Sequence, residues 1–98
     1  MDESERGGSS ENRRKRLLFR AQRRGFKEVD LIFGAYAQEA LAALDQQGLD
    51  QLEALLKAPD QDVYAWLRGA MPVPAEFDND VFRGLKSVMG RKGYTWNA

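Results

Sequence analysis

Three observations predict an all-α fold, a compact bundle of about five helices in a single domain. Apolar residues recur at the three- and four-residue spacing of helices, and no useful stretch alternates with the period of two that marks a strand. Glycine and proline divide the chain at short intervals, which indicates short connections. The 98 residues leave room for one hydrophobic core, and 43% hydrophobic with 31% charged residues is ordinary for a helical domain.

The N-terminal quarter predicts a tail followed by a basic helix. Residues 1–11 are polar and acidic, and we expect them to form a disordered tail. Asn12 is expected to cap a helix that runs from Arg13 to about Arg24, because asparagine accepts hydrogen bonds from the first free amides of a helix. Gly25 is expected to end this helix.

The middle of the chain predicts two helices. Residues 28–44 place apolar side chains on more than one face, which predicts a central, buried helix. Gly34 lies inside this helix, and we expect it to allow close packing against a neighbouring helix. The run Gln46-Gln47-Gly48 is interpreted as a break before a short third helix, which is marked by leucines at helical spacing and ends at residues 58–59.

The C-terminal part predicts two more helices. Asp60 is expected to cap a fourth helix, which Gly69 ends. The run Met-Pro-Val-Pro at residues 71–74 excludes helix and predicts a stiff connector. A last amphipathic helix is predicted to open at Glu76 and to stop at Gly90.

These limits define one domain, residues 12–90, followed by a flexible tail at residues 91–98. Tyr94 and Trp96 in that tail either fold back onto the bundle or serve as contact points for a partner. No apolar run approaches the roughly 18–20 residues that span a bilayer, and the N-terminus lacks the apolar stretch of a secretory signal. We therefore expect a cytoplasmic protein with no membrane insertion.

Charge is distributed unevenly although the formal net charge is zero. The net charge is −3 over residues 1–11, +8 over 12–27, −9 over 28–82 and +4 over 83–98. Such separation favours oriented docking to a charged partner. The basic helix could also contact phosphates, with Phe19 as a stacking residue, but the neutral domain and the missing recognition signatures make nucleic-acid binding the less favoured alternative.

Cysteine and histidine are both absent, which excludes disulfides and Cys- or His-liganded metal sites. It also removes the thiol nucleophile and the imidazole base of many enzymes. The remaining candidate carboxylates are Glu28, Asp30, Asp60 and Asp62. No metal-ligand spacing or Gly-rich loop accompanies them, so we expect caps and surface charges, with no catalytic residue, no metal and no tightly bound cofactor.

The junction between the first two predicted helices, Arg-Gly-Phe-Lys-Glu at residues 24–28, has a structural interpretation. Gly25 can turn the chain through a positive φ. Glu28 falls in the first turn of the next helix, where the helix dipole favours a carboxylate. Arg24 is expected to bond the last carbonyl groups of the first helix.

The same junction carries a family resemblance. Residues 23–30, Arg-Arg-Gly-Phe-Lys-Glu-Val-Asp, resemble the RGxxE signature of the SdhE family of bacterial flavinylation factors, whose mitochondrial members are called succinate dehydrogenase assembly factor 2. A second block is similar to that family as well: Leu55-Leu56, Pro59-Asp60 and then Tyr64-Ala65-Trp66-Leu67. The resemblance covers residues 13 to about 89, in order and with no large insertion.

The resemblance implies a five-helix bundle that acts as a chaperone-like FAD assembly factor and not as an enzyme. Such a factor binds the flavoprotein subunit of succinate dehydrogenase, of fumarate reductase or of both, and promotes covalent attachment of FAD to a histidine of that subunit. The partner-binding residues it implies are Arg23, Arg24, Gly25, Phe26, Glu28 and Asp30. Bacterial members are also described as the antitoxin CptB, which stands as an alternative function. We expect no nucleic-acid partner, and a monomer or weak dimer.

Overall fold

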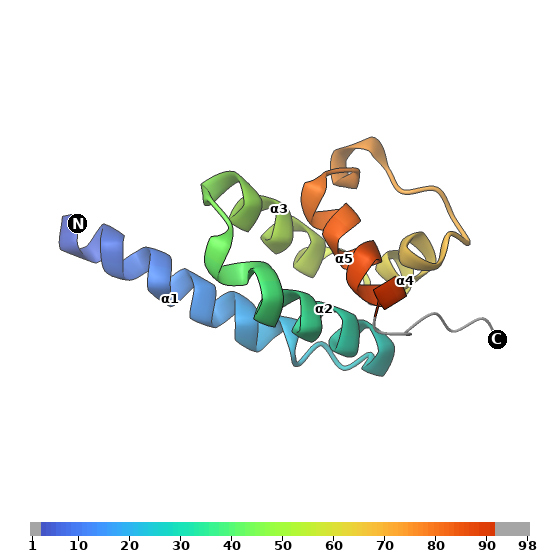
Figure 1. Ribbon diagram of the computed structural model, residues 1–98, viewed down its shortest axis with the longest axis horizontal. Helices are drawn as coiled ribbons and strands as arrows, with labels where there is room; N and C mark the ends of the chain where they lie inside the picture. Colours follow the sequence, from blue (N-terminus) through green and yellow to red (C-terminus); the bar gives the residue numbers. More distant parts are fainter. Residues whose placement is uncertain (1–2, 92–98) are drawn as a thin grey trace.

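The computed structural model describes the backbone of residues 3–91 and the side chains of residues 11–91. Within that range the chain is helical and contains no strand, which confirms the predicted all-α bundle of five helices (Figure 1). The elements are α1 (Glu3–Ala21), α2 (Lys27–Ala40), the 3₁₀ turn η1 (Leu41–Ala43), α3 (Gln46–Lys57), α4 (Asp60–Arg68), the 3₁₀ turn η2 (Ala75–Phe77) and α5 (Asp80–Arg91).

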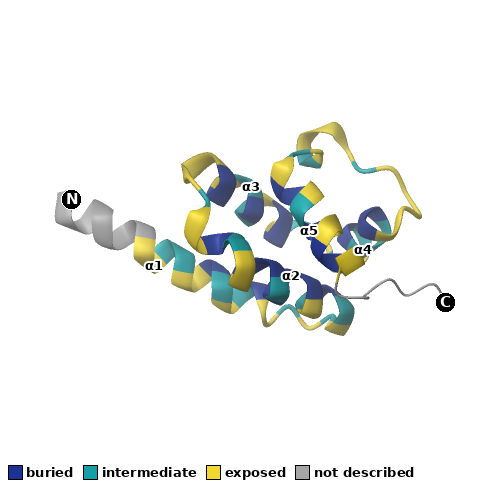
Figure 2. Cartoon of the chain, viewed as in Figure 1, coloured by how far each residue is buried: buried dark blue, intermediate teal, exposed yellow. Residues whose placement is uncertain are grey.

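The second helix is the centre of the bundle, as predicted. α1 and α2 form an antiparallel hairpin, and α2 also contacts α5 and α4 (Figure 1). α3 packs against α1 and α5, so that the helices enclose a single hydrophobic core. The apolar faces of all five helices point toward this core, and exposed residues lie on the outer faces (Figure 2).

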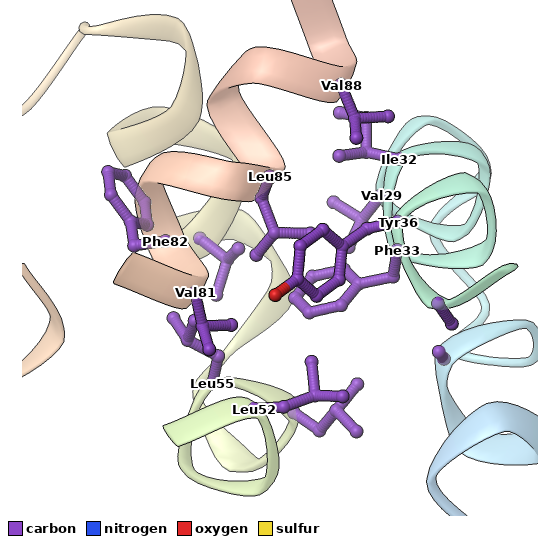
Figure 3. Packing of buried hydrophobic residues seen from close by; sticks show 14 of the residues in the cluster. Val29, Ile32, Phe33, Tyr36, Leu52, Leu55, Val81, Phe82, Leu85 and Val88 are labelled. Carbon is purple, nitrogen blue, oxygen red and sulfur yellow. The ribbon is translucent and has the colours of Figure 1, made fainter. Parts of the chain in front are cut away.

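The core is apolar throughout, because no polar or charged residue is buried among those described. α2 places Phe33 at its middle, with Leu52 and Leu55 of α3 and Leu85 of α5 around it (Figure 3). The largest fully buried side chains are Phe33, Leu17, Ile32, Leu49, Leu52, Leu55, Leu67, Leu85, Val29, Val63, Val81 and Val88.

The start of α1 differs from the prediction. The helix begins at Glu3 and ends at Ala21, so Asn12 lies inside it and the predicted cap at that residue is wrong. Helical backbone also extends into the segment for which the sequence predicts disorder. α1 also ends before the predicted residue, Arg24. The cause is a contact with the next helix, because the side chain of Asp30 accepts hydrogen bonds from the amides that follow α1.

Three other helix starts differ from the prediction. The predicted break at residues 46–48 is the first turn of α3, since Asp45 accepts a 2.8 Å hydrogen bond from the Gly48 amide. Asp60 is the first residue of α4, and Pro59 holds the N-cap position. The last helix begins at Asp80, after a separate 3₁₀ turn, and the Asn79 side chain accepts a hydrogen bond from the amide of Phe82.

α5 runs one residue beyond its predicted stop, to Arg91. The predicted tail contacts of Tyr94 and Trp96 lie outside the described residues. No helix in the described range is long and apolar enough to cross a membrane.

Two glycines mark how closely the helices approach. Gly34 is buried against α1, where a Cβ atom would lie 3.5 Å from Cγ of Gln22, an ordinary van der Waals distance. The tighter approach is at Gly84 of α5, where a Cβ atom would lie 2.6 Å from Cε1 of Tyr36. This contact could not be predicted from local spacing, because Gly84 and Tyr36 lie far apart in the sequence.

Replacing Gly84 by alanine tests the α2–α5 contact. We expect Gly84→Ala to lower the free energy of unfolding by about 1–3 kcal/mol, the usual cost of overpacking a core. Gly90→Ala is the matched control on the same helix, because no described residue of another element lies within 4 Å of a Cβ atom at that exposed position. Its stability should be unchanged or slightly higher. Urea unfolding of both variants provides the measurement, and equal stabilities would contradict the contact.

Candidate functional site at the α1–α2 junction

The turn between α1 and α2 depends on a glycine in the left-handed region. Gly25 has a φ of +93°, which disfavours any L side chain. No atom lies within 4 Å of a Cβ atom placed on it, so backbone conformation and not space requires glycine here. The predicted positive φ is confirmed. Gly25 is exposed at the tip of the turn.

Asp30 holds this turn from α2. Its Oδ1 accepts a 2.8 Å hydrogen bond from the Arg24 amide, and its Oδ2 accepts one of 3.3 Å from the Gly25 amide. Both carboxylate oxygens therefore accept hydrogen bonds from backbone amides of the turn that follows α1. Asp30 acts on the turn itself, which limits what its carboxylate can offer a partner.

Arg24 is the most buried charge of the junction, with 7% of its side chain exposed. Its guanidinium reaches from the turn to the end of α3. Nη1 donates to the carbonyl oxygen of Leu56 at 2.7 Å, and Nη2 donates to that of Ala58 at 3.0 Å. Nε donates to Oδ1 of Asp60 at 2.5 Å, and Nη2 pairs with the same oxygen. The predicted bonds to the first helix are wrong, because the acceptors belong to the α3–α4 corner.

The aromatic residue of the motif also faces inward. Phe26 holds the N-cap position of α2 without a side-chain cap, and its ring lies 5.0 Å from the ring of Tyr64 on α4. The guanidinium of Arg68 lies 5.2 Å from the Tyr64 ring on the same helix. These contacts join the beginning of α2 to α4.

Glu28 is the acidic residue of the motif that has no internal partner among the described residues. It lies in the first turn of α2 and is half-buried. Among the described residues, its carboxylate forms no hydrogen bond and no ion pair, whereas the other acidic residue of that turn, Asp30, is fully used. A partly desolvated, unpaired carboxylate on a fixed helix is suited to charge-assisted hydrogen bonds from an incoming donor.

A groove of about 360 Å³ lies beside the junction. Arg23 and Phe19, both exposed, line it, with the Arg23 guanidinium 4.3 Å from the Phe19 ring centre. Residues 58–60 line it as well. The groove therefore combines an aromatic surface with positive charge next to the exposed turn.

The structure thus divides the six predicted partner-binding residues into two sets. Arg24, Phe26 and Asp30 point into the protein and fix the turn. The second set lies at the surface and consists of Arg23, Gly25 and Glu28. The sequence analysis missed the role of Asp60 as the partner of Arg24, because 36 residues separate them and no local signal links them.

Much of the positive charge of α1 is also used internally. Arg13 pairs with Asp50 at 2.7 Å and with Glu53 at 2.8 Å on α3. Arg14 donates to the carbonyl oxygens of Leu41 at 3.4 Å and Leu44 at 2.7 Å. The basic helix is therefore partly neutralised by the acidic segment that it packs against.

These pairs shift ionisation. The hydrogen bonds that Arg13 donates to Asp50 and to Glu53, in that order of effect, raise the pKa of Arg13, and the hydrogen bond from Arg13 lowers the pKa of Glu53 below its ordinary value of 4.5. The predicted absence of a metal site stays a prediction, although residues 11–91 contain no cluster of three or more potential acidic ligands.

Known proteins resemble this chain over most of its length. A model of the family described as "Flavinator of succinate dehydrogenase" matches residues 15–89. The chain is 36% identical over 73 residues to "FAD assembly factor SdhE" of Acetobacter pasteurianus, covering 74% of this chain and 67% of that protein. It is 34% identical over 73 residues to "Succinate dehydrogenase assembly factor 2, mitochondrial" of Dictyostelium discoideum, covering 74% and 52%.

The Arabidopsis thaliana protein of the same name is 35% identical over 81 residues, which cover 79% of this chain and 43% of that protein. The chain spans about half the length of several mitochondrial relatives. The chain belongs to the family of flavinators of succinate dehydrogenase, which confirms the resemblance seen at residues 23–30.

Removing the Arg24 side chain should destabilise the whole domain. Arg24→Ala leaves the Asp60 carboxylate and two carbonyl groups without their shared donor, and we expect a loss of about 2–4 kcal/mol in the free energy of unfolding. Arg23→Ala is the control, because its exposed stacking contact is worth about 1 kcal/mol or less. Urea unfolding followed by circular dichroism distinguishes the two. Equal losses would show that Arg24 is no internal clamp.

The Arg13–Glu53 pair predicts a pH dependence. Because the folded-state pKa of Glu53 is lowered, its contribution to stability is present above its ordinary pKa of 4.5 and is lost as pH falls through the lower, folded value. Glu53→Gln should cost about 1 kcal/mol at pH 7, and the difference from the wild type should shrink between about pH 5 and pH 3. Glu76→Gln, which removes an exposed carboxylate in η2, serves as the control. A stability difference between Glu53→Gln and the wild type that stays constant across this pH range would refute the prediction.

Proposed function

We propose that this chain is an assembly factor that promotes covalent attachment of FAD to a histidine of the flavoprotein subunit of succinate dehydrogenase, fumarate reductase or both. Membership of the flavinator family and the names of the relatives support the assembly role. The observation that carries the site is the contrast within the junction. All bonds of Arg24 are made inside the protein, whereas Glu28, beside an exposed turn, has no partner among residues 11–91.

The chain acts by binding and not by acid–base chemistry. It contains no histidine or cysteine, so its own residues offer no imidazole base or thiol. Glu28 accepts hydrogen bonds from cationic or amide groups of the client, and the bare backbone at Gly25 lets the client approach closely. Arg23 lies beside this contact and favours an acidic group of the client.

Docking would hold the immature flavoprotein in the geometry in which its histidine and the reacting carbon of FAD are in line. The gain comes from proximity and orientation, while bond formation remains a reaction between the flavin and the client's histidine. The rigid hydrogen bonds of Arg24 and Asp30 behind the turn keep the contacting groups in place.

Nucleic-acid binding through the basic segment is less favoured by the structure than by the sequence, because several of its arginines already bind groups of the protein. Arg13, Arg14 and Arg24 each donate to acceptors within the protein. Their guanidinium groups would have to exchange these bonds for phosphates, which lowers the gain from each contact.

In-gel flavin fluorescence of the denatured client tests the proposal. The flavoprotein subunit is expressed in cells lacking such a factor, alone or with the wild type, Glu28→Gln or Glu11→Gln. We expect the wild type and Glu11→Gln, an exposed carboxylate on α1, to give equal covalent flavin. Glu28→Gln should need about tenfold more protein for the same yield, the effect of losing about 1.5 kcal/mol of binding.

A folding control keeps this test decisive. Glu28→Gln must unfold at the same urea concentration as Glu11→Gln, because Glu28 makes no internal bond among the described residues. Equal fluorescence with Glu28→Gln would remove the junction from the binding site. Equal fluorescence with and without the wild type, for both the succinate dehydrogenase and fumarate reductase subunits, would refute the function itself.

A further inference from the structure

A second polar cleft lies at the opposite end of α2 from the junction. It has a volume of about 300 Å³ and lies between the end of α2, the start of α3 and the start of α5. Its polar lining comes from Tyr36, Asp45, Gln47, Gln51 and Asp80. No lysine or arginine among the described residues lines it, so the cleft is acidic.

The hydroxyl of Tyr36 opens into this cleft without a partner. The residue is 95% buried, with 5% of its surface exposed, and its hydroxyl forms no hydrogen bond among the described residues. In that range, every side-chain nitrogen or oxygen that is sealed from solvent has a hydrogen-bond partner. The unpaired Tyr36 hydroxyl is therefore not sealed, and the cleft that Tyr36 lines gives access to it. Figure 3 shows the ring between α2 and α5 with its oxygen pointing away from α2.

The fold holds this tyrosine closely. Gly84 is the residue of α5 that faces the ring, and a Cβ atom there would clash with Cε1. A glycine inside a helix costs about 1 kcal/mol relative to alanine, so the chain tolerates a weaker α5 to keep the ring in this position. The hydroxyl is therefore presented at a fixed point of the cleft.

The charges around the hydroxyl favour a cation. Burial, and then the negative charge of Asp80, raise the pKa of Tyr36. The oxygen of the neutral hydroxyl can accept a hydrogen bond from an incoming donor. Asp80 has an exposed side chain whose Oδ1 accepts a 2.9 Å hydrogen bond from Arg83, and Arg83 also pairs with Asp78 at 3.0 Å. Asp45 uses Oδ1 to cap α3. Among the described residues, Asp80 and Asp45 each keep a second carboxylate oxygen that can accept a hydrogen bond.

We propose that this cleft binds the guanidinium group of an arginine side chain from a protein partner. Its planar fork offers several donors at once to the two acceptors that line the cleft, the Asp80 carboxylate and the Tyr36 oxygen, which a point-like ammonium matches less well. The site is separate from the junction, and the inference does not depend on the proposed function.

A titration with N-acetyl-arginine amide tests the site, followed by ¹⁵N amide shifts at constant ionic strength. We expect saturable shifts at the amides of Gly48 and Gly84, in the millimolar range typical of one charged contact. N-acetyl-citrulline amide has the same shape without the charge and should give no saturable shift. N-acetyl-lysine amide should bind about threefold or more weakly. Saturation by citrulline amide, or none by arginine amide, would overturn the proposal.

Two variants locate the contact. Asp80→Asn and Tyr36→Phe should each weaken binding of arginine amide by about fivefold. Asp78→Asn is the matched control, because Asp78 pairs with the same Arg83 but does not line the cleft, and its affinity should stay within twofold of the wild type. Thermal unfolding checks that each variant is folded. Equal weakening by Asp78→Asn and Asp80→Asn would mean a diffuse charge effect and would refute the site.

Discussion

The hydrogen bonds of one buried guanidinium fix the arrangement of this small bundle. Arg24 leaves the α1–α2 turn and satisfies the carbonyl groups of Leu56 and Ala58, which the end of α3 leaves without intrahelical donors. The same group pairs with Asp60 at the start of α4. Three helix ends therefore meet at one side chain. Because the burial of a charge is costly unless all its donors are used, the corner has little freedom to rearrange.

This constraint assigns opposite roles to neighbouring residues of one short motif. Asp30 and Arg24 hold the turn from within, whereas Gly25 is exposed and the Glu28 carboxylate has no partner in the part of the chain that the structure describes. The uneven charge of the chain is used in a similar way, because Arg13 of α1 pairs with the acidic α3. Part of the charge separation read from the sequence therefore stabilises the fold. Two charged surfaces remain exposed: the basic groove beside Arg23 and the acidic cleft at the far end of α2.

The sequence predicted the features that depend on local spacing. Val29, Ile32 and Phe33 lie on the buried face of α2 because a periodic apolar stripe leaves few other choices. It failed where a distant contact decides the outcome. The end of α1 depends on Asp30, and the role of Arg24 depends on a corner more than 30 residues away. Gly25 was predicted correctly since its positive φ is a property of the turn alone.

Hydrogen exchange on this chain, alone and with the flavin-free flavoprotein subunit, tests most directly whether the outward half of the junction is the docking surface. The account predicts slower exchange of the amides at residues 25–31 when the subunit is present, and loss of that protection in Glu28→Gln at the same concentrations. Residues 3–16 at the far end of α1 should exchange at equal rates with and without the subunit. Unchanged exchange at residues 25–31, together with protection on another face, would contradict the central claim.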